Sequence, residues 1–433
     1  MKFVKNCIFV FIIFLLISSS LQKDFQLLQP NPLYGYFVPM KKPVLRISNW
    51  CSGTYQDSLS AFNKENSGFR NYLVRLHNQV DYSLFSIPNA EKIVQGKDGY
   101  LFKEGSITSW LGWDFAGKKS CNEKIALLKK LKEKLKEKNI QLLVIFTPDK
   151  STFYPEYIPD RFLKQKKEPT NYSYYAEKCA EAGINIIDFD RWFVLAKDTS
   201  RFILYPKAGV HWSNYGAVLA ADSLLKYLRA KMNFSMPQMV IDSIETSSSA
   251  RNLDDDVAKA MNLIWKIPHP VYAYPKFHFV FDTTQKKPAA LFVGDSYYWN
   301  WSNTGIIRNL FSNEEFWYYC RDVYPESNTK KTFLTEINIE DAINRQNIII
   351  LIQVNGATGN LGYGFLDVAT SVFDTANSRL LKMKMTIRND PKWFKLIREK
   401  AEKANREVEQ QLHRDAMYML EQERKKTNLK QLK

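Results

Sequence analysis

Apolar runs of strand length alternate with amphipathic helical patterns along the middle of the chain, and this alternation limits the fold more than any other feature. Helical patterns at 122–138 and at about 172–182 each lead into an apolar run. Helices and strands that alternate at this spacing are typical of right-handed βαβ units around a parallel sheet. The strands are predicted at residues 141–146, 184–187, 289–293, 316–320 and 347–354. The chain is therefore predicted to be an α/β protein with a three-layer α/β/α sandwich.

The amino terminus has the pattern of an export segment. Lys2 and Lys5 precede an apolar run at 7–17, and three serines follow it. The run is shorter than the roughly 20 residues of a full membrane span, which favours a signal peptide, yet no small-x-small cleavage site follows. Residues 1–21 are therefore predicted to be a signal peptide or an uncleaved membrane anchor.

Four parts are expected along the chain. After the export segment, residues 22–90 form a proline-rich linker and a helical lead-in, with one helix expected over 57–85. Residues 91–375 contain all the predicted strands and form the main domain, in which 234–287 is less regular and indicates an insertion or a long connection. Residues 376–433 form a charged helical extension, with a long helix from Pro391 and an apolar stripe that includes Trp393 and Ala404.

The net charge of +16 does not by itself indicate a nucleic-acid partner. Basic residues alternate with glutamates on helical faces, and the sequence contains no recognisable nucleic-acid module. For an exported protein, such a charge suits an anionic membrane surface or an acidic polysaccharide, and a solvated surface is the simpler interpretation.

Four cysteines lie beyond the export segment: Cys51, Cys121, Cys179 and Cys320. Disulfides and isolated buried thiols are both open, because four cysteines allow three pairings and spacing does not choose among them. No CxxC pair indicates a metal site.

The chemistry is predicted at two distant points. A buried strand at 289–293 runs into Gly294, Asp295 and Ser296, which places a serine where open α/β sheets keep their chemistry, at the carboxyl end of a strand. His211 directly precedes a predicted helix that begins near Ser213. A serine and a histidine in such positions indicate acyl transfer by a hydroxyl nucleophile and an imidazole base.

Several motifs occur together in one order. They are Gly96 to Phe102, Pro148-Asp149-Lys150 with Tyr154-Pro155-Glu156, His211-Trp212-Ser213 with Gly216-Ala217, and Val293-Gly294-Asp295-Ser296. In these motifs the chain resembles the periplasmic SGNH-hydrolase-like polysaccharide O-acetyltransferases of the alginate acetylation type, over roughly residues 45–365. The histidine precedes the serine, as in that family, whereas ordinary GDSL esterases have the opposite order.

The resemblance implies an SGNH-hydrolase-like fold, a periplasmic or cell-envelope location and a polysaccharide acceptor. It implies Ser296 as the nucleophile and His211 as the base, with no metal or dissociable cofactor. It also implies a membrane-bound O-acyltransferase partner that supplies the acetyl group. The backbone N–H of Ser296 is expected to stabilise the oxyanion, and the side chain of Asn355 is expected to assist it.

One position departs from the family pattern. The alginate-type members have an aspartate two residues before the histidine, where this chain has Gly209. Asp295 is the predicted substitute, and Asp149 and Asp190 are the other candidates. A serine-histidine dyad and a loss of activity are also open.

Three further side chains are predicted to bind substrate. Lys150 follows a strand end and suits an acidic sugar, while Tyr297 and Trp299 next to the serine suit the faces of sugar rings. Two alternatives to acetyl transfer use the same site: a carbohydrate esterase with water as the acceptor, and a catalytically inactive polysaccharide-binding protein.

Overall fold

The structure is a computed structural model that describes residues 2–29, 31–35, 39–282, 286–325, 330–373, 375–404 and 406–431. Its internal contacts divide the chain into two compact units. Unit 1 comprises residues 1–101, 207–209 and 255–269. Unit 2 comprises residues 102–206, 210–254 and 270–433.

Unit 2 is built on a seven-stranded sheet with the order β10-β9-β8-β7-β11-β3-β4. The five strands from β8 to β4 run parallel, and β9 and β10 are antiparallel additions at one side. The strand bounds are β3 Gln141–Thr147, β4 Asn185–Asp188, β7 Ala289–Gly294, β8 Asn313–Tyr318, β9 Asp322–Tyr324, β10 Thr332–Phe333 and β11 Ile348–Val354. The predicted parallel sheet is confirmed, and its apolar central strands are covered on both faces as such sheets require.

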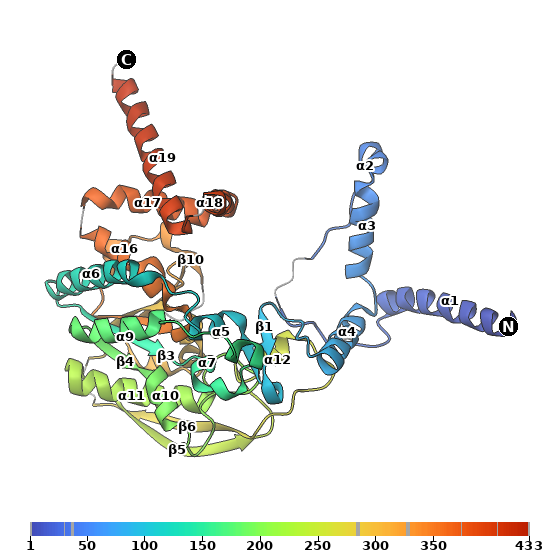
Figure 1. Cartoon of the computed structure of the whole chain (residues 1–433), viewed down its shortest axis with the longest axis horizontal. Coiled ribbons are helices and arrows are strands. Elements are labelled where there is room, and N and C mark those ends of the chain that lie inside the picture. Colours follow the sequence, from blue (N-terminus) through green and yellow to red (C-terminus); the bar gives the residue numbers. More distant parts are fainter. Residues whose placement is uncertain are drawn as a thin grey trace. The chain divides into compact units, whose positions relative to one another are not determined.

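Helices cover the two faces of this sheet (Figure 1). On one face, α6 (Gly117–Lys136), α9 (Asn171–Glu181) and α16 (Phe365–Val372) contribute to a single apolar core with the strands. On the other face lie α10 (Phe189–Ala196), α11 (Asn214–Met232) and α13 (Tyr298–Asn303). There the Trp301 indole N–H donates to the Ala217 carbonyl over 2.8 Å, which joins α13 to α11. The three-layer α/β/α architecture is thus confirmed.

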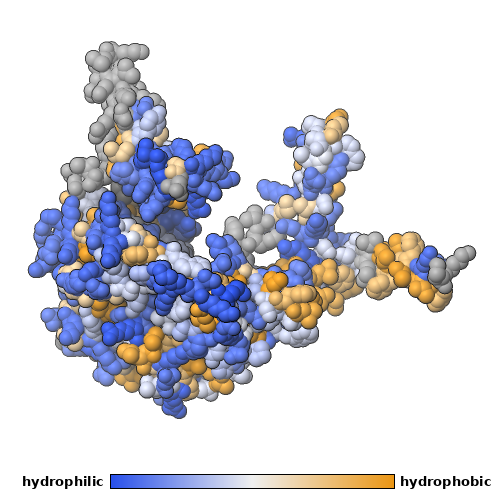
Figure 2. Space-filling model, viewed as in Figure 1, coloured by the Kyte–Doolittle hydropathy of each residue, from blue (hydrophilic) through white to orange (hydrophobic). Residues whose placement is uncertain are grey.

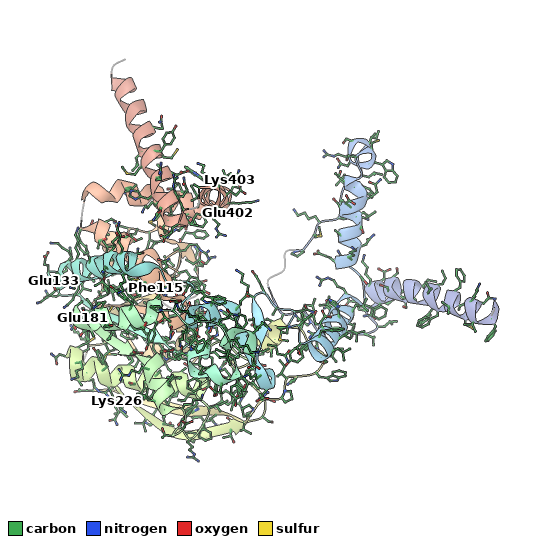
Figure 3. All side chains as sticks on the ribbon, viewed as in Figure 1. Phe115, Glu133, Glu181, Lys226, Glu402 and Lys403 are labelled. Carbon is green, nitrogen blue, oxygen red and sulfur yellow. The ribbon has the colours of Figure 1, made fainter. Side chains whose placement is uncertain are left out.

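The polar faces of these helices point away from the sheet. Figure 3 shows Glu133 on α6, Glu181 on α9 and Lys226 on α11 directed outward. Each helix therefore follows the amphipathic pattern that its sequence predicts.

The register of the sheet gathers the ends of four strands at one edge. Val354 on β11 pairs with Thr147 on β3, and Ile352 on β11 pairs with Gly294 on β7. A Cβ atom on Gly294 would lie 2.4 Å from the Ile352 carbonyl oxygen, so only glycine fits at the end of β7. We call the region just beyond the carboxyl ends of β3, β4, β7 and β11 the carboxyl edge of the sheet.

The segment at 234–287 is more regular than the sequence indicated. It contains the long antiparallel pair β5 (Gln238–Ser247) and β6 (Tyr272–Val280), with a register shift between Ile241 and Ser243. In the second half of β6, Phe277 and Phe279 alternate with Lys276 and His278, a short signal of period two that the interpretation as a long connection overlooked.

The single helix expected over 57–85 is two helices, α3 (Thr54–Glu65) and α4 (Arg70–Phe85). The chain turns between them at Gly68, whose place against the amino-terminal helix α1 (Lys2–Phe25) admits no side chain: a Cβ atom there would lie 2.5 Å from the Lys23 backbone nitrogen. The break therefore comes from packing within unit 1.

The carboxyl-terminal extension also differs from the single long helix expected after Pro391. It consists of α17 (Thr375–Asn389), α18 (Pro391–Lys403) and α19 (Val408–Gln431). A small apolar cluster joins the three helices through Ile387, Ile397, Leu412 and Ala416. Ala404 belongs to the end of α18 rather than to a continuing stripe.

The remaining elements are α2 Ile47–Cys51, β1 Ile93–Gln95, β2 Leu101–Lys103, α5 Glu104–Trp110, α7 Lys150–Phe153, α8 Asp160–Leu163, α12 Asp256–Ala260, α14 Ile306–Leu310 and α15 Ile339–Asn344.

The helix α1 presents apolar side chains to its surroundings, as Figure 2 shows by its orange surface. An 18-residue window within Phe3–Phe25 has a mean hydropathy of 2.2, so the helix is long and apolar enough to cross a membrane, a property that a signal sequence shares. The five cysteines all lie in described ranges and carry free thiols, with Cys121, Cys179 and Cys320 buried. The alternative of isolated buried thiols therefore describes these three.

Candidate active site

Ser296 and His211 lie side by side although 85 residues separate them. A hydrogen bond of 2.7 Å joins Nε2 of His211 to Oγ of Ser296. The imidazole is buried, at 6% exposure, while the serine is partly exposed. The carboxyl edge of the sheet thus brings together the two side chains that the sequence predicted as base and nucleophile, at the distance proton transfer requires.

The residues after His211 fix its position in the chain. The Trp212 side chain is fully buried and stacks near Trp301, with ring centroids 5.0 Å apart. Ser213 caps α11, as predicted, because its Oγ accepts the Gly216 N–H over 2.9 Å. The same hydroxyl donates to the Ile203 carbonyl over 2.7 Å. His211 therefore lies two residues before the N-cap of a long, largely buried helix.

Two tyrosines hold the backbone directly before His211. The hydroxyl groups of Tyr205 and Tyr297 lie 2.5 Å apart, and both reach the Val210 carbonyl, at 2.5 and 2.9 Å. Tyr297 also donates to the Pro148 carbonyl over 2.7 Å, and its ring meets the His211 ring edge to face at 5.0 Å. Tyr297 follows Ser296 in the chain, so this Tyr205–Tyr297 pair links the serine turn to the histidine loop.

Asp295 anchors the serine turn. Its buried carboxylate accepts hydrogen bonds from the Tyr297 N–H at 3.0 Å, the Val354 N–H at 2.7 Å and the Tyr363 hydroxyl at 2.8 Å. Burial raises its pKa, and these donors together with the charge of His211 oppose that rise. The hydrogen bonds of Asp295 therefore go to the serine turn and to the end of β11, so its predicted role as the carboxylate that supports His211 stays a prediction.

The other two candidate carboxylates form a separate buried network. Asp149 accepts from the Ser106 hydroxyl and caps α7 through the Ser151 N–H at 2.8 Å. Asp190 accepts the Asp149 N–H at 2.8 Å and an Asn355 side-chain N–H at 2.9 Å. Burial raises the pKa of Asp149 and, well above its usual range, that of Asp190. These contacts tie together the ends of β3, β4 and β11.

A comparison with protein families decides the identity of this domain. The family described as an SGNH hydrolase-like domain, acetyltransferase AlgX, matches residues 93–303, which include both His211 and Ser296. Residues 93–303 belong to this acetyltransferase family. No curated protein matches the chain.

The similarity of this chain to solved structures is low. The O-acetyltransferase domain of Pseudomonas putida AlgJ is 15% identical at a TM-score of 0.42, over 65% of this chain and 99% of that chain. Pseudomonas aeruginosa AlgX is 18% identical at 0.44, over 68% of this chain and 71% of that chain. Bacillus cereus PatB1 is 11% identical at a TM-score of 0.38, over 63% of this chain and 98% of that chain.

The structure gives the Asn355 side chain other partners than its predicted role requires. Its side-chain nitrogen donates to Thr152 Oγ1 at 3.0 Å and to Asp190 at 2.9 Å. Both N–H groups of the amide are therefore occupied, and the side chain offers none to an oxyanion in this structure. The Ser296 N–H, by contrast, has no hydrogen-bond acceptor among the described residues. Ser296 lies in the turn before α13, two residues ahead of the first residue of that helix.

Two of the three residues predicted to bind substrate, Lys150 and Tyr297, have buried side chains. Lys150 is 2% exposed, with its Nζ 5.8 Å from the Phe102 ring centre and 5.5 Å from that of Tyr205. Tyr297 is 3% exposed and belongs to the Tyr205–Tyr297 pair. Neither side chain presents a surface to a sugar. Trp299 remains partly exposed and packs edge to face on Phe316 at 5.1 Å, so its role stays a prediction.

Sequence reasoning overlooked two tyrosines of unit 2. Tyr363 donates to Asp295, and Tyr319 packs against Tyr363 with ring centroids 5.0 Å apart. Both have positive φ, at 54° and 51°, which no pattern of apolar and polar residues reveals. Among the described residues, no group of three or more His, Cys, Asp or Glu side chains is placed to hold a metal ion.

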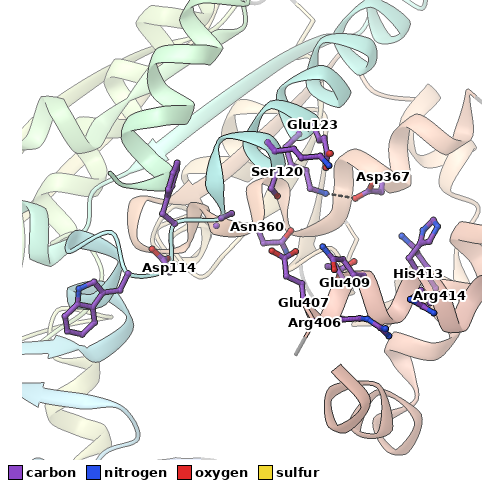
Figure 4. A pocket seen from close by; sticks show the side chains of 18 residues that line it. Asp114, Ser120, Glu123, Asn360, Asp367, Arg406, Glu407, Glu409, His413 and Arg414 are labelled. Atoms are coloured by element: carbon purple, nitrogen blue, oxygen red, sulfur yellow. Dashed lines mark hydrogen bonds and ion pairs between the residues drawn. The ribbon is translucent and has the colours of Figure 1, made fainter. Parts of the chain in front are cut away.

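A groove of about 960 Å³ lies elsewhere in unit 2, between α6 and the carboxyl-terminal helices (Figure 4). Acidic and basic side chains mix along it, and Lys124 pairs with Asp367 at 2.7 Å. We call it the charged groove; it is lined by Trp113, Asp114, Phe115, Ala116, Lys119, Ser120, Glu123, Lys124, Gly359, Asn360, Asp367, Lys384, Arg406, Glu407, Glu409, Gln410, His413 and Arg414. Its lining includes neither Ser296 nor His211.

Proposed function

We propose that this protein transfers acetyl groups to the hydroxyl groups of a polysaccharide through an acetyl ester on Ser296. The observation that carries the proposal is the 2.7 Å contact between Ser296 and His211 inside a domain of an acetyltransferase family. Such a contact activates a hydroxyl that is otherwise a weak nucleophile at neutral pH.

The reaction has two balanced halves. Ser296 Oγ bonds to the acetyl carbon, its proton passes to Nε2 of His211, and that proton then leaves with the donor's leaving group. In the second half, Nε2 takes a proton from a sugar hydroxyl as its oxygen attacks the same carbon, and the proton returns to Ser296 when the ester breaks. The Ser296 N–H is a donor for the oxyanion in both halves, because no acceptor among the described residues occupies it.

The acceptor is proposed to be a polysaccharide of the cell surface or of secreted material, as the family resemblance implies. The net charge of +16 supports an acidic polymer. The donor is proposed to be supplied by a membrane-bound O-acyltransferase that carries acetyl groups across the bilayer.

The proposed location is the periplasmic face of the cell envelope, with α1 retained as an anchor. The end of α1 belongs to the fold of unit 1: the Ser19 hydroxyl bonds that of Ser67 at 2.9 Å, and Gln22 is buried and accepts the Leu28 N–H at 3.0 Å. Cleavage after residue 21 would remove the Ser19–Ser67 contact and would make Gln22 the new amino terminus. Intact-mass measurement of the protein recovered from membranes checks this: a mass that lacks the first 20 or so residues contradicts a retained anchor.

The nucleophile is tested with an activated acetyl ester. The purified protein is expected to release acetate, and Ser296→Ala is expected to lose the activity down to background, while the exposed Ser312→Ala keeps it. A fluorophosphonate should label Ser296 in the native protein and nothing in Ser296→Ala. Equal rates for Ser296→Ala and the native protein, or no labelling, would remove the proposal and favour a non-catalytic polysaccharide-binding protein.

The acceptor is tested by adding polysaccharide to the same reaction. Transfer predicts that acetyl appears on the polymer and that release of free acetate falls correspondingly. If acetyl leaves only as free acetate with every acidic polymer tried, the esterase alternative is correct instead.

A further inference from the structure

Helix α4 of unit 1 exposes its apolar side chains, unlike the helices that cover the sheet. We call Leu73, Leu76, Val80 and Leu84 the outer stripe; their spacing of three or four residues places them along one side of the helix. Their exposed fractions are 58%, 51%, 39% and 72%. Contiguous apolar side chains that remain this exposed mark an interaction site.

The side of α4 that packs within unit 1 is polar. Asn78 and Gln79 are the two buried residues of the helix. The Asn78 side-chain N–H donates to the Met261 carbonyl over 2.7 Å. The Gln79 side-chain oxygen accepts the backbone N–H groups of Ile264 and Trp265 over 3.1 and 3.0 Å. Unit 1 therefore holds α4 by hydrogen bonds on its polar side and leaves the outer stripe uncovered.

These hydrogen bonds also hold a large aromatic side chain next to the outer stripe. Trp265 is 67% exposed, and its backbone is fixed by Gln79, which neighbours Leu76 on the surface of the helix. Tryptophan is enriched where a membrane meets water, because its ring is apolar and its N–H is polar. The side chains around the outer stripe therefore suit the boundary between hydrocarbon and lipid headgroups.

The start of α4 is joined to the end of α1. The hydroxyl groups of Ser19 and Ser67 lie 2.9 Å apart, and a Cβ atom on Gly68 would lie 2.5 Å from the Lys23 backbone nitrogen. Lys23 is the first charged residue after the apolar run of α1. The helix α4 thus begins at the level where α1 would leave the hydrocarbon. Figure 2 shows apolar surface over both helices.

We propose that the outer stripe and Trp265 insert into the lipid surface of the bilayer that α1 crosses. The inference rests on the retained anchor of the proposed function. An amphipathic helix in this setting lies in the interface, with its apolar side about 5–10 Å into the boundary of headgroups and acyl chains. Lipid is the favoured occupant because α1 and α4 are tied within one unit, so a bilayer crossed by α1 is always adjacent to α4.

The test places the environment-sensitive fluorophore NBD on the outer stripe of the full chain. Leu84→Cys is labelled after Cys7→Ala and Cys51→Ala remove the two exposed native thiols. The protein is then reconstituted into vesicles of phosphatidylethanolamine and phosphatidylglycerol. We expect a blue-shifted emission that is quenched more by lipids with a nitroxide at the top of the acyl chain than by lipids with a nitroxide at its end.

The matched control is a label on Glu133→Cys of α6. Its side chain is 64% exposed, but α6 buries its apolar side in the core. The emission of this label should remain that of an aqueous fluorophore, without quenching by either lipid.

A second variant removes the contact while leaving the core intact. Leu73→Glu combined with Leu76→Glu should leave the melting temperature unchanged, since both native side chains are exposed, and should return the label at position 84 to aqueous emission. An aqueous label at position 84 in the protein without these two changes overturns the inference. A blue shift without lipid quenching means that a second copy covers the outer stripe, and this also overturns it.

Intact-mass measurement of the same vesicles keeps this result apart from the proposed function. An intact chain whose label stays aqueous overturns the inference alone. A chain cleaved after residue 21 whose label is still quenched overturns the retained anchor alone, and a cleaved chain without quenching overturns both. Acetate release that survives Ser296→Ala removes the proposed activity and leaves the lipid contact as measured.

Discussion

Unit 2 holds charged side chains in two very different settings, the carboxyl edge of the sheet and the charged groove. At the carboxyl edge, Asp149, Asp190 and Asp295 are almost fully buried, and each carboxylate has specific donors. Along the charged groove, Lys124 and Asp367 pair at 2.7 Å with side chains that are 23% and 40% exposed. The same kinds of residue therefore have different tasks in the two places.

The difference follows from water. A buried carboxylate has lost its hydration, so each missing donor costs about 1–3 kcal/mol, and the network can hold atoms in one arrangement. An exposed ion pair exchanges with water and is worth about 0–1 kcal/mol. The carboxyl edge can thus position a nucleophile and a base, whereas substitution of a charged residue in the charged groove should change stability little.

Asp295→Asn is expected to have the largest effect on stability and activity, and it tests the difference between the two regions most directly. An amide presents a donor to either the Tyr297 or the Val354 N–H, and it removes the charge that interacts with His211. We expect stability to fall by about 1–3 kcal/mol and kcat/KM for an activated acetyl ester to fall by about 10²-fold. This loss is smaller than the roughly 10⁴-fold that follows the loss of an aspartate bonded directly to the catalytic histidine, because Asp295 bonds the serine turn instead. Denaturant unfolding and steady-state kinetics measure the two.

The matched variant is Tyr363→Phe, which removes one donor to Asp295 and leaves the charge. It should lose stability but less than about tenfold in kcat/KM. Equal losses of activity in both variants would mean that Asp295 acts as a turn anchor alone.

A smaller effect is expected from Tyr297→Phe. The substitution keeps the ring against His211 and deletes the hydroxyl that bonds Tyr205, Pro148 and Val210. Because a displacement of about 1 Å can cost 10²-fold, we expect kcat/KM to fall between about tenfold and 10²-fold with the fold intact. The control is Tyr174→Phe on α9, which also deletes one hydroxyl, here bonded to Asn122 at 2.7 Å. Native kinetics in Tyr297→Phe would show that the Tyr205–Tyr297 pair does not position the histidine.

The buried pair Asp149 and Asp190 should make stability depend on pH. Burial and the charge of Asp149 hold the pKa of Asp190 well above its usual value of about 4, so between those values the folded state binds more protons than the unfolded state. This contribution is complete below about pH 4 and is lost as pH rises through the folded pKa, with a slope of at most about 1.4 kcal/mol per pH unit. Asp190→Asn should show a shallower fall in unfolding free energy; an identical slope contradicts the shifted pKa.

The smallest effect is expected in the charged groove. Lys124→Met removes one partner of the exposed pair with Asp367 and should change stability by less than about 1 kcal/mol, with activity unchanged. Thermal unfolding in low and high salt is the measurement. A loss comparable to that of Asp295→Asn would erase the distinction between the two regions.

Much of the sheet could be predicted because its strands are buried on both faces and therefore read as continuous apolar runs. The strand at 289–293, the serine turn and the Ser213 cap depend on neighbouring residues, and all three are present. The helix predicted over 57–85 failed for the opposite reason. Its break at Gly68 is required by α1, which is distant in sequence.

The two central residues of the predicted site, Ser296 and His211, lie together, whereas several residues predicted around them have other partners. Local sequence places Asn355 and Lys150 just after strand ends, which is where functional side chains gather. It does not show that Asp190 lies close enough to occupy the Asn355 amide, or that aromatic rings enclose Lys150. Side-chain partners of this kind come from elements more than 40 residues away.

The sequence alone determined the α/β alternation, the apolar amino-terminal helix and the pair of a serine after one strand and a histidine before one helix, since these depend on short-range periodicity and turn chemistry. Only the tertiary structure decided that Ser296 and His211 meet at 2.7 Å and that the Asp295 carboxylate accepts its hydrogen bonds from the serine turn and the end of β11. Those facts depend on the register of parallel strands, which brings distant segments to one edge and is set by packing of the whole core.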